Sequence, residues 1–206
     1  MHNIVIIDYS LNNLWSVEKS LQYLGYNFIS SNNHDDLLKA SHLILPGVGS
    51  FYKAMKIIKD KKLDLVINQA VLKRKIKILG ICLGFQLLCT KGFEDGVTEG
   101  LGLINSEVDK FDSNIVKVPH VGFNSVKINT TNSILYKGIK NFSDFYFVHS
   151  YKLSLPNEFY ASENIATCLY ENEFIASIEQ KNVFGTQFHP EKSQINGLKI
   201  IKNFLE

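Results

Sequence analysis

One cysteine stands between two glycines at the end of an apolar run, in the segment GICLG at residues 80–84. A residue at a sharp strand-to-helix turn projects its side chain from the carboxyl edge of a sheet, and flanking glycines relieve the crowding that a Cβ would cause there. A helix that begins directly after the turn favours the thiolate form of Cys82 through its dipole and free N–H groups. The segment predicts a nucleophile elbow, although a buried structural cysteine fits this segment alone equally well.

A cysteine nucleophile needs a base, and one of the six histidines stands in a suitable context. His189 ends a predicted strand in GTQFHPEKS at residues 185–193, Pro190 stops the strand pairing, and Glu191 follows. An acid at that spacing accepts a hydrogen bond from the imidazole and fixes its tautomer, so that the histidine can take and return a proton. Together the two motifs supply a nucleophile, a base and an orienting acid in the chain order Cys82, His189, Glu191.

The tetrahedral intermediate of such a reaction also needs N–H donors. The segment LPGVGS at residues 45–50 ends a predicted strand, and its glycine-rich backbone can present N–H groups beside the N–H of Leu83. An ordinary turn between a strand and a helix would also be satisfied by Pro-Gly-x-Gly, so this motif alone leaves both interpretations open.

The first half of the chain contains the elements that must position these residues. Strand-like runs alternate with apolar residues at helical spacing. The predicted strands are residues 3–8, 26–30, 42–45 and 76–81, and the predicted helices are 14–24, with Asn12 or Asn13 as its cap, 50–59 and 63–73. Strands separated by helices of this length indicate right-handed crossovers and a parallel sheet that is covered on both faces.

The second half predicts a different arrangement, because short aromatic and β-branched runs are separated by turn residues. The predicted strands are residues 103–111, 115–118, 125–128, 145–150, 166–169, 174–179 and 183–188. A helix with Ser193 as its cap ends the chain. We therefore expect one α/β domain over residues 1–206, a three-layer sandwich with a mostly parallel central sheet and antiparallel additions in the C-terminal half.

Composition excludes several classes of protein. The 206 residues include 22 basic and 20 acidic ones, a balance without the basic stripe of a nucleic-acid-binding protein. Cys82, Cys89 and Cys168 form neither a disulfide framework nor a metal-binding spacing. No signal peptide and no apolar run of about 18 residues is evident. We expect a reduced, soluble, cytoplasmic protein without a metal or an organic cofactor.

The combination of LPGVGSF, GICLGFQLL and FGTQFHPEKS resembles the class I (triad) glutamine amidotransferases, whose fold is flavodoxin-like. Four further segments are similar to the glutaminase subunits of imidazole glycerol phosphate synthases: IDYSLNNLWSVEKSL near the start, VPHVGFN at residues 118–124, YFVHSY at 146–151 and HPEKS at 189–193. The resemblance spans nearly the whole chain.

The resemblance implies a role for each motif. Cys82 attacks the side-chain amide of glutamine and forms a glutamyl thioester, His189 acts as acid and base, and Glu191 orients it. The oxyanion is expected to be bound by backbone groups of Val48, Gly49 and Leu83. Glutamine is expected to be bound by Gly49, Gln86, Glu94 and the backbone of His149, Ser150 and Tyr151.

The resemblance also implies a partner, a cyclase subunit with a (β/α)8 barrel that receives the ammonia through a channel, as in histidine biosynthesis. The residues expected at the interface are Asn13, Tyr146 and Lys192. Trp15, where the family more often has a basic residue, is either a contact for the partner or a core residue. His120 and Asn124 belong to VPHVGFN but receive no role.

The segment Ser10-Leu11-Asn12 departs from the family, which commonly has glycines there. This departure leaves a second acceptor open, namely a synthase that builds an acetamidino group on a surface-polysaccharide sugar. Two other classes also stay open. A catalytically silent scaffold is disfavoured by the complete triad, and a cysteine peptidase or hydrolase is disfavoured by Gln86 and by the strand-terminal His-Pro-Glu.

Overall fold

The computed structural model describes residues 3–11, 14–130, 132–153, 164–170 and 172–206. Its helices are α1 (Leu14–Tyr23), α2 (His34–Lys39), α3 (Phe51–Asp60), α4 (Leu63–Asn68), the π-helix η1 (Gln69–Lys73), α5 (Leu83–Leu87), the 3-10 helix η2 (Pro190–Lys192) and α7 (Gln194–Leu205). Its strands are β1 (Ile4–Ile7), β2 (Phe28–Ser31), β3 (His42–Gly47), β4 (Lys77–Cys82), β5 (Cys89–Gly92), β6 (Thr98–Glu99), β7 (Ile104–Lys110), β8 (His120–Ile128), β9 (Ser143–His149), β10 (Tyr151–Leu153), β11 (Asn164–Leu169), β12 (Glu173–Gln180) and β13 (Val183–Thr186).

A nine-stranded sheet forms the centre of the described chain, in the order β2-β1-β3-β4-β13-β12-β11-β8-β9. The strands from β2 to β13 in this order are parallel, and those from β13 to β9 pair antiparallel. The expected α/β sheet with antiparallel additions from the C-terminal half is therefore confirmed, and four of its strand pairs are parallel and four antiparallel. The described residues also form a smaller sheet in the order β10-β7-β5-β6.

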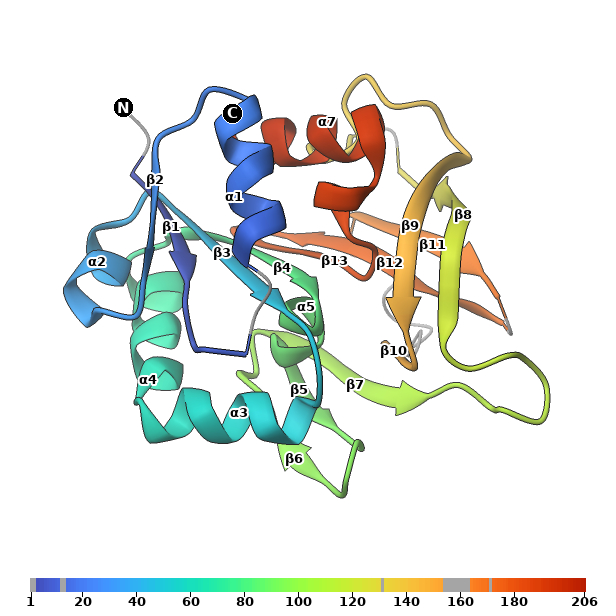
Figure 1. Ribbon diagram of the computed structural model, residues 1–206, viewed down its shortest axis with the longest axis horizontal. Coiled ribbons are helices and arrows are strands. Elements are labelled where there is room, and N and C mark those ends of the chain that lie inside the picture. The colour runs from blue at the N-terminus through green and yellow to red at the C-terminus, as the bar shows by residue number, and fades with distance from the viewer. Residues whose placement is uncertain (1–2, 12–13, 131, 154–163, 171) are drawn as a thin grey trace.

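Helices cover both faces of the central sheet, as Figure 1 shows with α1 and α7 above it and α3 and α4 below it. The alternation along β1 explains these layers, because successive side chains of a strand point to opposite faces. Ile4 and Ile6 pack in the core with α1 and α7, whereas Val5 and Ile7 pack in the core with α2, α3 and α4. All four side chains are buried, as expected for a parallel strand covered on both sides.

The predicted elbow lies where β4 meets α5. Cys82 has φ 53° and ψ −111°, a conformation that L-residues rarely adopt. The flanking glycines allow the backbones to approach closely. A Cβ on Gly80 would lie 2.7 Å from the backbone of Phe85, and one on Gly84 would overlap the carbonyl oxygen of Leu45 at the end of β3. The strained turn is thus held by backbone contacts that only glycine permits.

Some predictions about elements were wrong or incomplete. Residues 115–118 form no strand. A turn stands there, in which the N–H groups of Ile115 and Val116 donate to the carbonyl of Asp112. The short elements α2, β5, β6 and β10 were not predicted. Ser193 precedes α7 but does not cap it with its side chain, whose hydroxyl donates to the carbonyl of His189 instead. The expected caps Asn12 and Asn13 lie outside the described residues.

No helix in the described ranges is long and apolar enough to cross a membrane.

The contact at Gly84 leads to a prediction about stability. We expect Gly84→Ala to lower the free energy of unfolding by about 3 kcal/mol, because either α5 or the end of β3 must move away. Gly138→Ala serves as the control, since a Cβ there meets nothing within 4 Å and only the φ of 73° resists it. That control should cost about 1–2 kcal/mol. Urea denaturation measures the free energy of unfolding of both variants. An equal decrease in the two would contradict the proposed steric role of Gly84.

Candidate active site

The three sequence motifs meet because β3, β4 and β13 are adjacent and parallel, so their carboxyl ends share one edge of the sheet. Ligands bind outside the carboxyl ends of strands in open α/β sheets. Gly47 at the end of β3 pairs with Cys82 at the end of β4. His189 follows the end of β13 by three residues. The nucleophile, the glycine-rich loop and the histidine therefore converge without any long excursion of the chain.

A cavity of about 270 Å³ opens at this edge and is called here the Cys82 pocket. Its volume lies just below the roughly 300–1,000 Å³ typical of pockets for drug-sized ligands, which suits a small substrate. The residues that line it are Val48, Gly49, Cys82, Leu83, Gln86, Glu94, Pro119, Val148, His149, Ser150, Tyr151, His189 and Lys192. Every residue that the sequence assigned to the oxyanion or to glutamine is among them. Of the expected triad, only Glu191 lies behind the pocket wall.

Glu191 binds the ring nitrogen of His189 that is opposite the one available to the pocket. Nδ1 of the imidazole lies 2.7 Å from Oε1 of Glu191, and the two side chains are only 3% and 4% exposed. Because a carboxylate only accepts, the imidazole donates through Nδ1. The opposite ring nitrogen, Nε2, is buried and has no hydrogen-bond partner within the described residues. This nitrogen is consequently the one that can exchange a proton in the pocket.

His189 favours its protonated form. Burial alone would lower the pKa of His189, but the negative sulfur of Cys82 and the carboxylate of Glu191 outweigh burial and raise that pKa from 6.5 to about 10. Cys82 and His189 both line the pocket, and Cys82 makes the largest contribution that raises this pKa. The arrangement is an imidazolium that faces a sulfur nucleophile, with its positive charge balanced from both sides.

Gln86, which is expected to bind glutamine, is buried in α5 and lines the Cys82 pocket. Its Nε2 donates to the carbonyl of Tyr151 at 2.8 Å and to Oε1 of Gln187 at 2.9 Å. Both amide hydrogens are therefore used, and the carbonyl oxygen of the side chain remains as an acceptor for a ligand in the pocket.

Gln187 is a site residue that the sequence analysis missed. It is fully buried, and its Nε2 lies 3.8 Å from Sγ of Cys82, where it can donate to the sulfur. Its position two residues before His189 was the available signal, because it places Gln187 at the carboxyl end of β13, beside the nucleophile.

Carboxylates stand on the other side of the pocket. Glu94 lines the pocket and accepts a hydrogen bond of 2.7 Å from the N–H of Phe51, the first residue of α3. Asp95 accepts from the hydroxyl of Ser50 at 3.3 Å. The pKa of Tyr151 is raised by burial and by the negative charges of Glu94 and Asp95. This negative side of the pocket suits a cationic group such as an α-ammonium.

The expected oxyanion groups lie close to Cys82. Leu83 is the first residue of α5, so its N–H has no partner within the helix. Gly49 has a φ of 97°, which L side chains rarely adopt, and Val48 is 41% exposed. The loop between β3 and α3 thus has, at the pocket rim, a backbone conformation that favours glycine at position 49.

The expected interface residues divide into two groups. Tyr146 and Lys192 lie together, with Nζ of Lys192 at 6.0 Å from the centre of the Tyr146 ring, and Lys192 also lines the pocket. Asn13 lies outside the described residues. Trp15 is 65% exposed, so its interpretation as a core residue was wrong.

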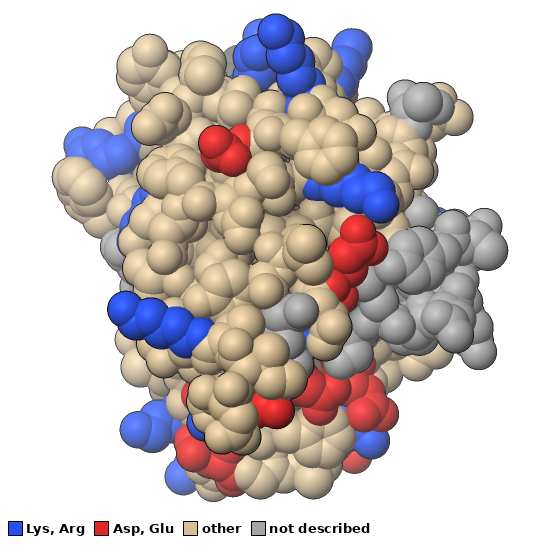
Figure 2. Space-filling model, turned by 90° about the vertical axis from the view of Figure 1, so that its right-hand side faces the viewer, with Lys and Arg blue, Asp and Glu red and all other residues tan. Residues whose placement is uncertain are grey.

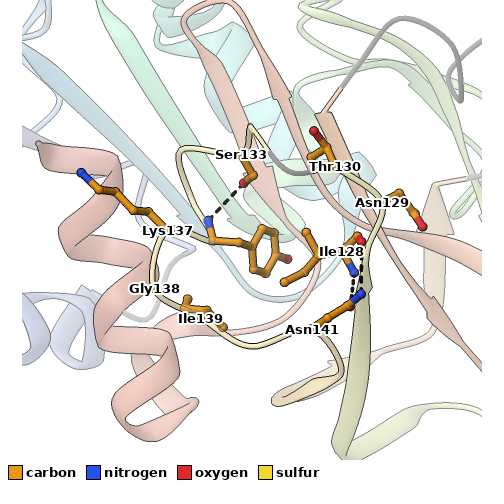
Figure 3. A pocket seen from close by; sticks show the side chains of 9 residues that line it. Ile128, Asn129, Thr130, Ser133, Lys137, Gly138, Ile139 and Asn141 are labelled. Carbon is orange, nitrogen blue, oxygen red and sulfur yellow. Dashed lines mark hydrogen bonds between the residues drawn. The ribbon is translucent and has the colours of Figure 1, made fainter.

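A larger cavity of about 840 Å³ lies elsewhere, lined by Ile128, Asn129, Thr130, Ser133, Tyr136, Lys137, Gly138, Ile139 and Asn141. Figure 3 shows that its polar groups hold the surrounding loop. The side chain of Asn141 bonds both backbone groups of Ile128, and the Ser133 hydroxyl accepts from the N–H of Tyr136. None of the residues that line this cavity belongs to the Cys82 pocket, so we assign the chemistry to the smaller cavity.

Comparison with known proteins gives a consistent result. The family model of Glutamine amidotransferase class-I matches residues 5–206. The chain is 47% identical over 203 residues to imidazole glycerol phosphate synthase subunit HisH 1 of Campylobacter jejuni, with 98% of each chain covered. It is 45% identical over 208 residues to subunit HisH of Methanosarcina acetivorans, with 100% of this chain and 99% of the other covered.

Among solved structures, the chain is similar to PurLQS from Thermotoga maritima. The TM-score is 0.72 at 18% sequence identity, and the match covers 100% of this chain and 98% of the other. At that identity the similarity concerns the fold, and it agrees with the expected flavodoxin-like arrangement of a central sheet between helices.

The charge balance at His189 leads to a second prediction. We expect Cys82→Ala to lower the pKa of His189 from about 10, because it removes the larger of the two contributions that oppose burial. NMR titration of the ring measures this value. Cys89→Ala is the matched control, since Cys89 is buried and its sulfur contacts the carbonyl of Phe85 instead.

The sign of the effect on stability follows from the same shift. A pKa that is higher in the folded than in the unfolded state contributes stability that is complete below about pH 6.5 and is lost between pH 6.5 and 10. Cys82→Ala should weaken this His189 contribution in that window. An unchanged pKa of His189 in Cys82→Ala would contradict the ion pair.

Proposed function

Because the chain belongs to the class-I glutamine amidotransferases, we propose that it hydrolyses L-glutamine to glutamate and ammonia with Cys82, His189 and Glu191. One observation carries this proposal: Cys82 and a His189–Glu191 hydrogen-bonded pair meet at a pocket that Gln86 and Glu94 also line. An amide acceptor and a carboxylate line the same small pocket as the nucleophile, which suits a free amino acid with a side-chain amide better than a peptide. A free amino acid with a side-chain amide uses both.

The first half of the reaction forms a thioester. Glu94 attracts the α-ammonium group of the substrate, and the free side-chain oxygen of Gln86 accepts a hydrogen bond from it. Sγ of Cys82 then attacks the carbon of the side-chain amide, and the C=O bond becomes a C–O⁻ bond. His189 donates the proton on Nε2 to the amide nitrogen, the C=O bond re-forms as the C–N bond breaks, and ammonia leaves the thioester.

The second half consumes water. His189, now neutral, takes a proton from a water molecule, whose oxygen attacks the thioester carbon. As the C=O bond re-forms, the C–S bond breaks and Cys82 leaves as the thiolate. The new carboxyl group releases the remaining proton of the water to solvent, glutamate leaves, and the proton on His189 restores the imidazolium that faces Cys82. Glu191 keeps the proton on Nδ1 throughout, so the exchange always occurs at Nε2.

The loop between β3 and α3 is proposed to switch this chemistry. The N–H of Leu83 is one oxyanion donor, and a flip of a peptide at Val48 or Gly49 would supply or remove the second. Loss of one such donor typically costs about 100- to 1,000-fold in rate. The glycine at position 49 and the exposure of Val48 support a loop with two accessible arrangements, because glycine adopts positive and negative φ with similar ease.

The acceptor of the ammonia is proposed from the relatives, which are named as subunits of imidazole glycerol phosphate synthase. We propose that this chain forms a heterodimer with a (β/α)8 cyclase subunit. The ammonia would pass through that subunit to make imidazole glycerol phosphate in histidine biosynthesis. A synthase that builds an acetamidino sugar remains the alternative acceptor, on the evidence of Ser10, which adopts a φ of 77° where the family commonly has glycine.

An apolar surface beside the pocket is the proposed docking site for the cyclase. Val121 and Phe123 of β8 are 57% and 51% exposed, and they pair directly with Val148 and Tyr146 of β9. Figure 2 looks at this side of the molecule and shows a largely uncharged centre with charges mainly around it. Val148 also lines the Cys82 pocket. A subunit seated on this surface would cover the mouth from which ammonia leaves.

Glutamate release is the direct test of the proposed function. We expect slow hydrolysis by the isolated chain and an increase of about 100- to 1,000-fold when the cyclase subunit and its phosphoribulosyl acceptor are present. Cys82→Ala should abolish hydrolysis in both conditions, whereas Cys89→Ala should retain it, because the Cys89 sulfur lies outside the pocket.

Each other outcome of that assay has a distinct meaning. Fast hydrolysis by the isolated chain would refute the loop switch but retain the triad. Hydrolysis that ignores the cyclase subunit would point to the sugar-modifying synthase. The complete absence of hydrolysis would support a scaffold, and cleavage of peptides would support a cysteine peptidase.

The docking surface gives a separate prediction. We expect Phe123→Ala to weaken binding of the cyclase subunit by at least about tenfold, since a large aromatic contact at the centre of an interface is typically worth more than 1 kcal/mol. The slow hydrolysis by the isolated chain should not change. Leu65→Ala is the control, because Leu65 is 65% exposed on α4, below the sheet. Titration calorimetry measures both, and equal losses would show that the docking surface lies elsewhere.

A further inference from the structure

Two histidines outside the triad form a buried pair. His120 begins β8 and His149 ends β9, and the two residues stand directly opposite each other in the antiparallel ladder. Both are buried, and Nδ1 of His120 lies 3.0 Å from Nε2 of His149. A hydrogen bond between two imidazoles needs one protonated and one bare nitrogen, so the tautomers of the pair are coupled.

The hydrogen-bond partners of the two rings determine which ring nitrogens carry a proton. Nδ1 of His149 lies 2.7 Å from the carbonyl of Tyr151, which only accepts, so the proton of His149 is on Nδ1. In a neutral ring Nε2 is then bare, and the proton between the rings belongs to Nδ1 of His120. Nε2 of His120 is left as an acceptor, with Nδ2 of Asn124 at 3.5 Å. The hydrogen bonds therefore all run in one direction, from Asn124 to His120, from His120 to His149 and from His149 to the carbonyl of Tyr151. This series is called here the histidine relay.

The surroundings keep both rings neutral. His120 stacks on Tyr170 and Phe147, with ring centres 4.0 and 4.9 Å away. Burial lowers the pKa of His120 to about 4. Burial also lowers the pKa of His149 to about 3. The hydrogen bond to the Tyr151 carbonyl opposes this shift, whereas His120, His189 and Lys152 add to it. No carboxylate contributes to either shift, so the relay carries no charge at neutral pH.

The relay ends at the Cys82 pocket. The carbonyl of Tyr151 accepts from His149 and also from Gln86, so both of its lone pairs are occupied. Gln86 in turn contacts Gln187, whose amide reaches Sγ of Cys82. The Tyr151 carbonyl is therefore the point at which the relay meets the side chains that surround the substrate.

We propose that His120 is a positioning residue for the glutamine site. As a neutral donor from Nδ1 it holds His149, which holds the Tyr151 carbonyl, which sets the orientation of Gln86. The inference rests on the proposed glutaminase function. It assigns the segment VPHVGFN a role besides surface contacts. His120 is buried, although Val121 and Phe123 of the same strand are exposed.

Histidine NMR tests the relay without any assay of activity. In water the Nε2–H tautomer of neutral histidine is the more common, whereas the relay requires Nδ1–H on both His120 and His149. We expect two of the six ¹⁵N-labelled histidines to show the Nδ1–H pattern and not to titrate between pH 5 and 9. His120→Asn assigns the signals. An Nε2–H tautomer, or a titration in that range, on either ring would overturn the proposal.

Kinetics test the effect on the substrate. We expect His120→Phe to raise KM for glutamine about tenfold while kcat changes less than about threefold, because Gln86 contacts the substrate away from the reacting bond. Phenylalanine keeps the ring stacking but removes the donor to His149. His120→Asn places an amide N–H near the position of Nδ1 and should restore KM to within about threefold of the wild-type value. His42→Phe is the control, a buried histidine beside Phe204 and remote from the pocket.

The outcomes separate this inference from the proposed function. An unchanged KM in folded His120→Phe, or a KM raised equally in His42→Phe, would overturn the relay alone. If His120→Phe does not fold, His120→Asn still decides, because a KM raised tenfold despite the retained donor would overturn the relay. The absence of glutamine hydrolysis by wild-type protein with every partner would refute the proposed function, and the NMR pattern would still decide the relay.

Discussion

The close approach of α5 to the end of β3 is the constraint on which the rest of the site depends. Gly84 packs against the carbonyl of Leu45, and Gly47 packs against Leu83 and the hydroxyl of Tyr9. These contacts leave no room for side chains, so they hold Cys82 in its positive-φ turn. They also place the N–H of Leu83 beside the glycine-rich loop. The nucleophile and the backbone groups expected to bind the oxyanion therefore lie on segments that pack directly against each other.

Unsatisfied polar atoms mark where this unit does chemistry. Within the described residues, the buried side-chain atoms without a partner include Nε2 of His189, Oε2 of Glu191 and the hydroxyl of Tyr9. Buried polar groups without partners are costly and therefore rare, so three of them around one elbow are informative. By contrast, the carbonyl of Tyr151 and the amide nitrogen of Gln86 are fully used. The polar groups that hold the shape of the pocket therefore have hydrogen-bond partners, whereas several groups beside the nucleophile do not.

The sequence predicted what depends on local backbone requirements. The glycines around Cys82, the loop at residues 46–49 and the His-Pro-Glu segment each demand particular residues at fixed spacing, so they were recognisable without a structure. Contacts set by strand register were not predictable in this way. The pairing of His120 with His149 depends on how β8 aligns with β9, and the contact of Gln187 with Cys82 depends on how β13 lies beside β4. Residues 115–118 have β-branched composition, but Asp112 ties them into a turn.

Three histidines near one cavity illustrate how surroundings decide protonation. His189 has two negative neighbours, Cys82 and Glu191, which overcome burial and raise its pKa to about 10. His149 lines the same pocket but faces aromatic rings and His120, and burial lowers its pKa to about 3. A substrate amide in the pocket therefore meets only one imidazole that carries a proton to give, at Nε2 of His189. His120 and His149 are neutral, and their protons are used in hydrogen bonds within the protein. They therefore cannot donate a proton to the substrate, so this proton comes from His189 alone.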